Sequence, residues 1–415
     1  MQATSACVAR ENCRLCGSDE LHDALSLAPT PPANAFQPSQ ERALQAQRFA
    51  LQVRRCFECG HSQLKHVVDP NVLFADYVYV SGTSPAYVAH LNEFAASAIA
   101  LLDLQKGDLV VEIGSNDGTL LRPFQSHGAR VQGIDPARDI SDSANQGGIP
   151  TINSFFDMSI ADAIVAEHGK ARLVAANNVC AHVDDLQGLV AAVRHMLAAD
   201  GELWLEVSYL KSVVQHTLFD TIYHEHLDYH RVAPLRQFFA ANGLALWDAE
   251  PIATHGGSIR VRVAHPGRRA TTARVAQLIA EESSLGLDCE RGLAQLSTDI
   301  RVAGEQLNAL LDQYVDAGLT GAGYGAPAKA TTLMHQFGLD HRRINFIIDD
   351  SPWKQGLFSP GLGIPVVSAD QGRTRKRDFM LVLAWNFAEP IMNNNRWFIE
   401  GGGKFVVPLP TLQVH

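Results

Sequence analysis

The chain has no excess of positive charge, few charged residues and no long apolar run, and each of these absences argues against a class of protein. Its 415 residues carry a formal net charge of -10, which would repel a phosphate backbone and argues against a general nucleic-acid binder. Only 19% of the residues are charged whereas 46% are hydrophobic, unlike the composition of disordered chains. We therefore expect globular modules that can still hold one anionic ligand locally.

Nothing in the sequence has the length and apolarity of a membrane span. The longest apolar run lies near 379–388, and residues 1–13 contain no apolar stretch of signal-peptide length. We therefore expect a cytoplasmic protein without a membrane partner. Because a chain of 415 residues exceeds the size at which one core keeps growing, two or three domains are expected.

Cysteine is scarce, and four of the seven cysteines form two CxxC pairs, Cys13 with Cys16 and Cys56 with Cys59. In a reducing compartment such pairs favour metal binding, because two intervening residues let a tight turn aim both thiolates at one ion. Four thiolates make a closed tetrahedral zinc site, so we expect this zinc to serve folding and not chemistry. A redox pair and an RNA-binding knuckle are the alternatives, although the basic and aromatic residues of the latter are missing.

A buried strand followed by a glycine-rich turn is predicted near residue 110. Residues 108–114 (DLVVEIG) lead through Ser115, Asn116, Asp117 and Gly118 into a helix, where backbone N–H groups would face a ligand. The next strand ends at Asp135, 21 residues after Gly114, where a carboxylate can accept both ribose hydroxyls. The pattern predicts a nucleotide-type cofactor.

Further strands are predicted at 149–152, 172–179, 202–207, 244–252 and 258–264, with helices between them. This order resembles the class I methyltransferase fold, a Rossmann-like α/β architecture that binds S-adenosylmethionine. The resemblance implies a set of cofactor residues: Glu112, Gly114 and Gly118 near the methionine part, Asp135 at the ribose, Phe155 and Phe156 at the adenine, and also Asn116 and Asn178. For both phenylalanines, filling the core is the alternative.

Residues 221–227 (TIYHEHL) place a phenol, two imidazoles and a carboxylate in consecutive positions. The spacing is not HExxH, so a zinc ion held on one helical face is not supported. Methylation of a carbon beside a carbonyl needs a base for the α proton and a donor for the enolate oxygen, tasks that suit histidine. His182 follows the fourth strand at the ligand-binding edge of such a sheet. The clustering favours general acid–base chemistry over purely structural histidines.

Seven motifs follow one another over nearly the whole chain: the paired CxxC, YxYxSGTS (77–84), EIGSNDGTLL (112–121), NNVxAHV (177–183), FDTIYHEHLDY (219–229), HGGSIRV (255–261) and GYGAPAKATTLMH (323–335). Together they resemble the zinc-containing sugar C-methyltransferases of deoxysugar biosynthesis. Those enzymes use S-adenosylmethionine to methylate C-3 of a dTDP-linked 4-keto-hexose, sometimes a 3-amino one. The resemblance implies the same cofactors, a structural zinc and a nucleotide-sugar substrate for this chain.

The resemblance also implies roles for individual residues. His226 would be the base that takes the C-3 proton, and Tyr223, Glu225, His182 and Tyr77 would line the sugar pocket. A methyltransferase for another nucleotide-sugar or small keto substrate, an NAD-dependent oxidoreductase and a non-catalytic zinc-ribbon interaction protein are the competing interpretations. The exact sugar and the oligomeric state stay open.

The C-terminal part repeats a nucleotide-binding pattern. A helical stretch over 274–315 leads to a second glycine-rich turn at 321–325 and a strand at 344–349, which predicts a second Rossmann-like domain. We expect it to close over the nucleotide-sugar with Lys329 near the diphosphate, a structural role being the alternative. Arg260 could meet a phosphate or lie on the surface. The expected domains are 1–70 for zinc, 71–266 for S-adenosylmethionine and 267–415 at the C-terminus.

Overall fold

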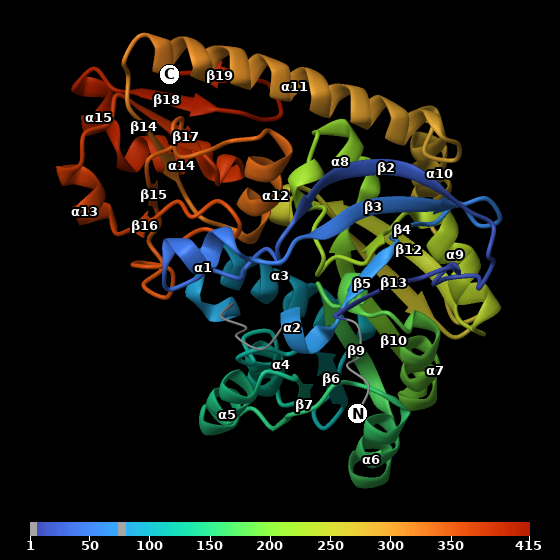
Figure 1. The fold of residues 1–415 in the computed structure, drawn as a ribbon. Coiled ribbons are helices and arrows are strands. Elements are labelled where there is room, and N and C mark those ends of the chain that lie inside the picture. Colours follow the sequence, from blue (N-terminus) through green and yellow to red (C-terminus); the bar gives the residue numbers. More distant parts are fainter. Residues whose placement is uncertain (1–5, 74–79) are drawn as a thin grey trace, which may run out of the picture.

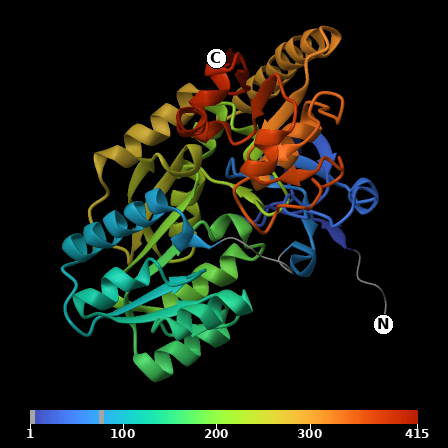
Figure 2. The ribbon, with the colours of Figure 1, turned by 90° about the vertical axis from the view of Figure 1, so that its left-hand side faces the viewer.

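A computed structural model describes residues 6–73 and 80–415 (Figure 1). In the second view, the N-terminal module in blue lies against the C-terminal module in orange and red, and the central module in teal and green lies below both (Figure 2). Each module is built around its own sheet.

The N-terminal module is an antiparallel sheet in the order β11-β4-β3-β2, with a small separate pair of strands, β1 and β5. Its strand β11 comes from the FDTIYHEHLDY motif and not from the N-terminal residues, so this module and the central one are interleaved. The elements are β1 (Cys7–Ala9), β2 (Leu21–Thr30), α1 (Gln40–Leu44), β3 (Phe49–Cys56), β4 (Ser62–Leu64), β5 (His66–Val68), α2 (Pro70–Leu73) and β11 (Asp228–Tyr229).

The central sheet has the order β12-β13-β10-β9-β6-β7-β8. Its middle strands are parallel, and β13 lies antiparallel to both β10 and β12. The strands are β6 (Leu109–Ile113), β7 (Arg130–Ile134), β8 (Thr151–Ile152), β9 (Ala171–Asn177), β10 (Leu197–Ser208), β12 (Ala245–Ile252) and β13 (Ser258–Ala264). This is the class I methyltransferase order, so the predicted fold class is confirmed.

Helices cover both faces of the central sheet, as expected where the strands are buried almost throughout. They are α3 (Pro85–Leu102), α4 (Leu121–His127), α5 (Arg138–Gln146), α6 (Met158–His168), α7 (Leu186–Met196), α8 (Leu210–Gln215) and α9 (Val232–Ala241). α10 (Ala273–Ser284) also packs its Val275 and Leu278 into this core. The domain boundary expected after residue 266 stays a prediction, because residues beyond it also pack into the central core.

The C-terminal module has the sheet order β16-β15-β14-β17-β18-β19 and is parallel except for its last strand. The long helix α11 (Arg291–Asp316) connects it to the central module along the top of Figure 1. The remaining elements are β14 (Gly321–Tyr324), α12 (Ala328–Gln336), β15 (Ile347–Ile348), β16 (Val366–Val367), α13 (Ala369–Thr374), β17 (Phe379–Val382), α14 (Ala388–Asn394), α15 (Arg396–Glu400), β18 (Lys404–Val407) and β19 (Gln413–Val414). The predicted Rossmann-like character is present.

One continuous hydrophobic cluster joins the three modules. It includes Leu51 of β3, Phe219 and Ile222 of the FDTIYHEHLDY motif, and Leu333 of α12, all essentially buried. The segment that carries the candidate catalytic residues is therefore anchored in a core shared by the outer modules. Among the described residues, no helix combines the length and apolarity needed to cross a bilayer.

Candidate functional site

The four predicted zinc ligands converge. The Sγ atoms of Cys13, Cys16, Cys56 and Cys59 all lie within 4.8 Å of one another, with 3.6 Å between Cys13 and Cys59 and between Cys16 and Cys56. None of the four forms a disulfide. Thiolates about 2.3 Å from a tetrahedral zinc ion stand at such separations, so the donor set fits zinc with no open position for water.

The first glycine-rich turn has the predicted strand-to-helix form. Gly114 has a φ of 70° and its α-hydrogen faces Val179, so a Cβ atom there would lie 2.4 Å from that side chain. The backbone N–H of Asn116 donates to Asp135 at 2.9 Å, which places the end of β7 against the turn. Only glycine allows both the positive φ and the close approach.

Two acids at this turn are poised for a ligand with donors or positive charge. Glu112 is buried, and its Oε2 has no hydrogen-bond partner among the described residues. Burial, followed by the nearby charges of Asp135 and Asp117, raises the pKa of Glu112 well above its usual value. Burial also raises the pKa of Asp135. A cationic or hydroxyl-bearing ligand would relieve this cost.

The two aromatic residues predicted near the adenine differ in environment. Phe155 is 60% exposed, so it does not fill the core, whereas Phe156 is partly buried and packs against the core of the sheet. Both follow β8, at the same end of the sheet as the turn. An exposed ring beside a nucleotide-type site is suited to stacking.

Asn178 lies directly after β9 with a φ of 56°, and its Nδ2 donates to the phenol of Tyr87 at 3.1 Å. Its neighbour Asn177 was not selected from the sequence, yet its buried side-chain amide has no partner among the described residues. Two consecutive asparagines directly after a strand are the sequence signal that could have identified Asn177 as a candidate ligand-binding residue. Tyr87, on α3, was missed because no motif marked it.

Residues 81–82 close over the turn from the other side. The backbone N–H of Ser81 donates to the side chain of Asn116 at 2.9 Å, and that of Gly82 donates to Asp117 at 3.1 Å. The motif that precedes the sheet therefore holds the turn through its backbone N–H groups. Tyr77, assigned to the sugar pocket, lies outside the described residues.

Arg260 is neither on the surface nor directed at a phosphate. It is buried, and its guanidinium donates to Glu206 at 2.7 Å and packs over the ring of Phe94. Glu206 also accepts from His90 at 2.7 Å. The expectation that Arg260 meets a phosphate or lies on the surface was wrong. Its partner Glu206 lies on the neighbouring strand β10, and the sequence of β13 alone does not show which strand lies beside it.

The candidate catalytic residues Tyr223, His226 and His182 form one aromatic cluster. The centroids of the Tyr223 and His226 rings are 4.2 Å apart, and those of His182 and His226 are 5.0 Å apart in an edge-to-face arrangement. His182 comes from the segment after β9, and the other two come from the TIYHEHL segment. Distant parts of the sequence are thus joined at the carboxyl edge of the central sheet.

Hydrogen bonding fixes the tautomer of His226. Its Nδ1 lies 2.7 Å from the carbonyl oxygen of Thr221. Because a carbonyl only accepts, Nδ1 carries the hydrogen, and Nε2 of the neutral ring carries the lone pair. Burial lowers the pKa of His182 to about 4, against hydrogen bonds to the backbone of Glu225 and Asn178, so that ring is neutral near pH 7.

The other two residues of the HEH triplet point elsewhere. His224 is buried against the N-terminal sheet, with its Nε2 3.3 Å from the carbonyl oxygen of Phe49. Glu225 is buried and accepts from Nδ2 of Asn34 at 3.1 Å, and burial raises its pKa to about 7. Asn34 lies in the proline-rich stretch after β2, where sequence patterns gave no sign of a role.

Lys329, expected near the diphosphate, is mostly buried and has partners inside the protein. Its Nζ lies 3.6 Å from Oδ2 of Asp220 and 4.1 Å from the centroid of the Trp385 ring. Asp220 is fully buried and also accepts from the indole N–H of Trp385 at 2.7 Å. The ammonium is therefore neutralised inside the protein and ties the C-terminal module to the segment before Tyr223.

Family models cover most of the chain: a zinc binding domain over 13–74, a methyltransferase domain over 87–249 and a C-methyltransferase C-terminal domain over 253–410. C-methyltransferase NovU from Streptomyces niveus is 37% identical over 409 residues, which is 97% of this chain and 96% of that protein. This chain belongs to the C-methyltransferase family. It is a methyltransferase with S-adenosylmethionine as methyl donor and a zinc-binding N-terminal module, as the sequence predicted.

Solved structures of other methyltransferases cover less than half of this C-methyltransferase. Magnesium protoporphyrin IX methyltransferase from Synechocystis is 19% identical with a TM-score of 0.34, over 43% of this chain and 83% of that one. An S-adenosylmethionine-dependent methyltransferase from Clostridium acetobutylicum is 12% identical with a TM-score of 0.36, over 48% of this chain and 96% of that one. At these scores the likenesses say nothing about the substrate.

Proposed function

We propose that this C-methyltransferase methylates C-3 of a dTDP-linked 4-keto-deoxysugar, with an amino or a hydroxyl group at C-3. The observation that carries the proposal is the contact of His226 with Tyr223 and His182 at the edge of the central sheet. Such a cluster suits removal of a proton beside a carbonyl. The resemblance of the ordered motifs to sugar C-methyltransferases supports the same substrate class.

In this proposal, Nε2 of His226 removes the C-3 proton, because Nδ1 is committed to the carbonyl of Thr221. The electron pair moves into the C-4 carbonyl, whose oxygen takes the negative charge. The neutral His182 and the phenol of Tyr223 lie where they can orient the base and stabilise that oxygen. Burial keeps His182 uncharged, so it would act as a hydrogen-bonding group and not as a cation.

S-adenosylmethionine, when bound, supplies an electrophilic methyl group. C-3 then forms a bond to the methyl carbon as the sulfur–carbon bond breaks, and the C-4 carbonyl re-forms. Glu112, Gly114, Asn116, Gly118 and Asp135 would hold the methionine and ribose parts, with Asn178 and the rings of Phe155 and Phe156 beside the nucleoside. The displacement requires no Lewis acid, in keeping with a closed four-thiolate zinc site.

Incubation with S-adenosylmethionine and a panel of nucleotide-linked 4-keto-sugars tests the substrate class. We expect mass spectrometry to show the gain of one methyl group on a dTDP-linked 4-keto-deoxysugar, and NMR to place it on C-3. Methylation of only a keto substrate without a nucleotide would favour the alternative of a small-molecule C-methyltransferase. Methylation at oxygen or nitrogen would contradict the proposed chemistry.

A further inference from the structure

A buried arginine lies inside the zinc knuckle. Arg14 follows Cys13 and precedes Cys16 by two residues, so it belongs to the turn that presents two of the thiolates. Its side chain has 0% exposure. A guanidinium removed from water in this way must be paired and hydrogen-bonded, since an unpaired one would be strongly destabilising.

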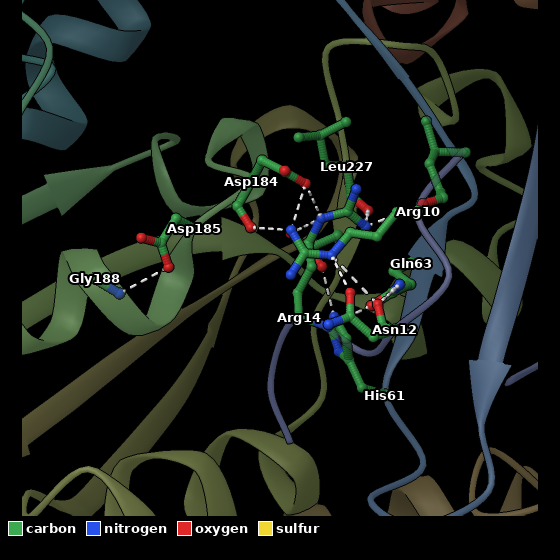
Figure 3. A network of polar contacts seen from close by, with 11 residues as sticks. Arg10, Asn12, Arg14, His61, Gln63, Asp184, Asp185, Gly188 and Leu227 are labelled. Atoms are coloured by element: carbon green, nitrogen blue, oxygen red, sulfur yellow. Dashed lines mark hydrogen bonds and ion pairs between the residues drawn. The ribbon is translucent and has the colours of Figure 1, made fainter. Parts of the chain in front are cut away.

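The backbone of Arg14 is fixed to the N-terminal sheet. Its N–H donates to Oε1 of Gln63 at 2.8 Å, and Nε2 of Gln63 donates back to the carbonyl of Asn12 at 2.9 Å. Gln63 lies on β4 and is itself buried. This double contact, visible in Figure 3, sets where the Arg14 side chain leaves the knuckle.

The guanidinium leaves the knuckle toward both segments that carry the imidazoles. Its Nε donates to Oδ1 of Asp184 at 2.9 Å, and its Nη1 donates to the carbonyl of Leu227 at 3.3 Å and to that of Leu64 at 3.0 Å. Figure 3 shows Arg14 beside Asp184, with dashed lines for its polar contacts. Asp184 is two residues after His182, and Leu227 directly follows His226.

The peptide groups of Leu227 complete the connection. Its N–H donates to the carbonyl of Ala181 at 2.6 Å, directly before His182, and its carbonyl accepts from the N–H of Leu64 at 2.8 Å. The backbone beside one imidazole is therefore bonded to the backbone beside the other. Arg14 contacts both segments from the side of the zinc site. Oδ2 of Asp228 also lies 3.9 Å from its Nε.

We propose that Arg14 is a positioning residue, which holds the segments 180–184 and 226–228 in register and so sets the geometry of His226 against His182. The zinc knuckle is then more than a folding device, because the ion fixes the turn from which Arg14 extends. This inference rests on the proposed role of His226 as the base. Small displacements of such a base cost on the order of 10²-fold in rate.

Arg14→Ala is the primary variant, and Arg54→Ala is its matched control. Arg54 lies on β3 of the N-terminal sheet and pairs with the exposed Glu11 and Asp23, neither of which belongs to the segments 180–184 or 226–228. We expect Arg14→Ala to lower kcat on the order of 10²-fold with an unchanged Kd for S-adenosylmethionine. Arg14→Lys should recover part of kcat, because one ammonium can reach Asp184 or the carbonyls but not all of them. Arg54→Ala should match the wild type.

Hydrogen exchange supplies a readout that needs no sugar substrate. In the zinc-loaded protein with S-adenosylmethionine bound, we expect Arg14→Ala to speed exchange at least tenfold in peptides covering 221–228, while peptides covering 49–56 stay as protected as in the wild type. A wild type that methylates no sugar of the panel would reject the proposed function, and the exchange result would still decide whether Arg14 holds these segments.

Asp184→Asn probes the same link from the catalytic side. The side chain of Asp184 is 46% exposed, so this variant should fold and keep its zinc. We expect it to lower kcat in the same direction as Arg14→Ala, by a smaller factor because the bonds to Leu64 and Leu227 remain. The proposal is overturned if Asp184→Asn keeps wild-type kcat and exchange while Arg14→Ala merely loses zinc, or if both variants behave as the wild type.

Discussion

The two glycine-rich turns of the chain share one backbone plan and differ in their surroundings. After β6, the N–H of Asn116 donates to Asp135 at the end of the next strand, at 2.9 Å. After β14, the N–H of Ala326 donates to Asp349 in the same way, at 2.6 Å. A sequence pattern that fixes this backbone therefore occurs twice, once in each Rossmann-like module.

The first turn is prepared for a ligand, and the second is occupied by the protein itself. Two residues before Gly114, the first turn has the buried acid Glu112, whose Oε2 has no partner among the described residues. The equivalent position of the second turn, two residues before Gly325, is Gly323, which has no side chain. At the second turn, Lys354 donates to the carbonyl of Ala326 at 2.8 Å and lies over the ring of Phe36. On the proposed cofactor assignment, the same local fold serves binding in one place and packing in the other.

His226→Asn should give the largest effect, since it removes the proposed base at the edge of the first turn's sheet. We expect kcat to fall by about 10³-fold or more, within the upper range of general base catalysis. Kd for S-adenosylmethionine should not change. Steady-state kinetics and calorimetry measure the two quantities, and full activity in this variant would remove His226 from the mechanism.

Glu112→Gln against Asp349→Asn compares the turns directly. We expect Glu112→Gln to raise Kd for S-adenosylmethionine by about 10- to 100-fold, the usual cost of a hydrogen bond to a charged group. Asp349→Asn should leave that Kd unchanged. Titration calorimetry of both variants is the measurement, and equal weakening by the two would mean that the second turn also takes part in cofactor binding.

Glu225→Gln should produce a smaller effect, visible in the pH dependence of stability. Burial raises the pKa of Glu225 from 4.5 to about 7 in the folded protein. The folded state therefore binds the proton more tightly than the unfolded state, and the stability that this supplies is lost as the pH rises through about 7. Relative to Glu225→Gln, the wild type should lose about 3 kcal/mol between pH 4.5 and 8.

Urea unfolding of both proteins at acid and neutral pH measures this difference. If the difference between their free energies of unfolding does not vary with pH, Glu225 does not titrate in this range. A parallel measurement on Asp349→Asn, at the second turn, is the control for the general effect of replacing a carboxylate by an amide at a sheet edge.

Much of the fold could be predicted because each strand of the central sheet is a short apolar run bounded by turn residues. The four thiolates were equally readable, since CxxC spacing is a local signal. The sequence also identified Tyr223 and His226 as candidate catalytic residues, because they lie close together in the TIYHEHL segment. It could not show that His224 turns toward Phe49 while His226 turns toward His182, because which way each side chain points depends on the tertiary packing around a short irregular segment.

Contacts between distant segments account for the rest. Asn34 reaches Glu225 across 191 positions, and Arg260 meets Glu206 only because β13 inserts beside β10. Lys329 follows a phosphate-binding pattern, yet Asp220 neutralises it from another module. Such partners depend on how the modules pack, which a single sequence does not encode in any local pattern.

Exchange of the C-3 hydrogen in deuterium oxide, with the zinc-loaded enzyme and dTDP-linked 4-keto-deoxysugar but no methyl donor, tests the central claim most directly. The account predicts that the wild type incorporates deuterium at C-3, seen by mass spectrometry and NMR, and that His226→Asn does not. Equal incorporation by both proteins, or methyl transfer by a wild type that never exchanges this hydrogen even with S-adenosylhomocysteine bound, would contradict it.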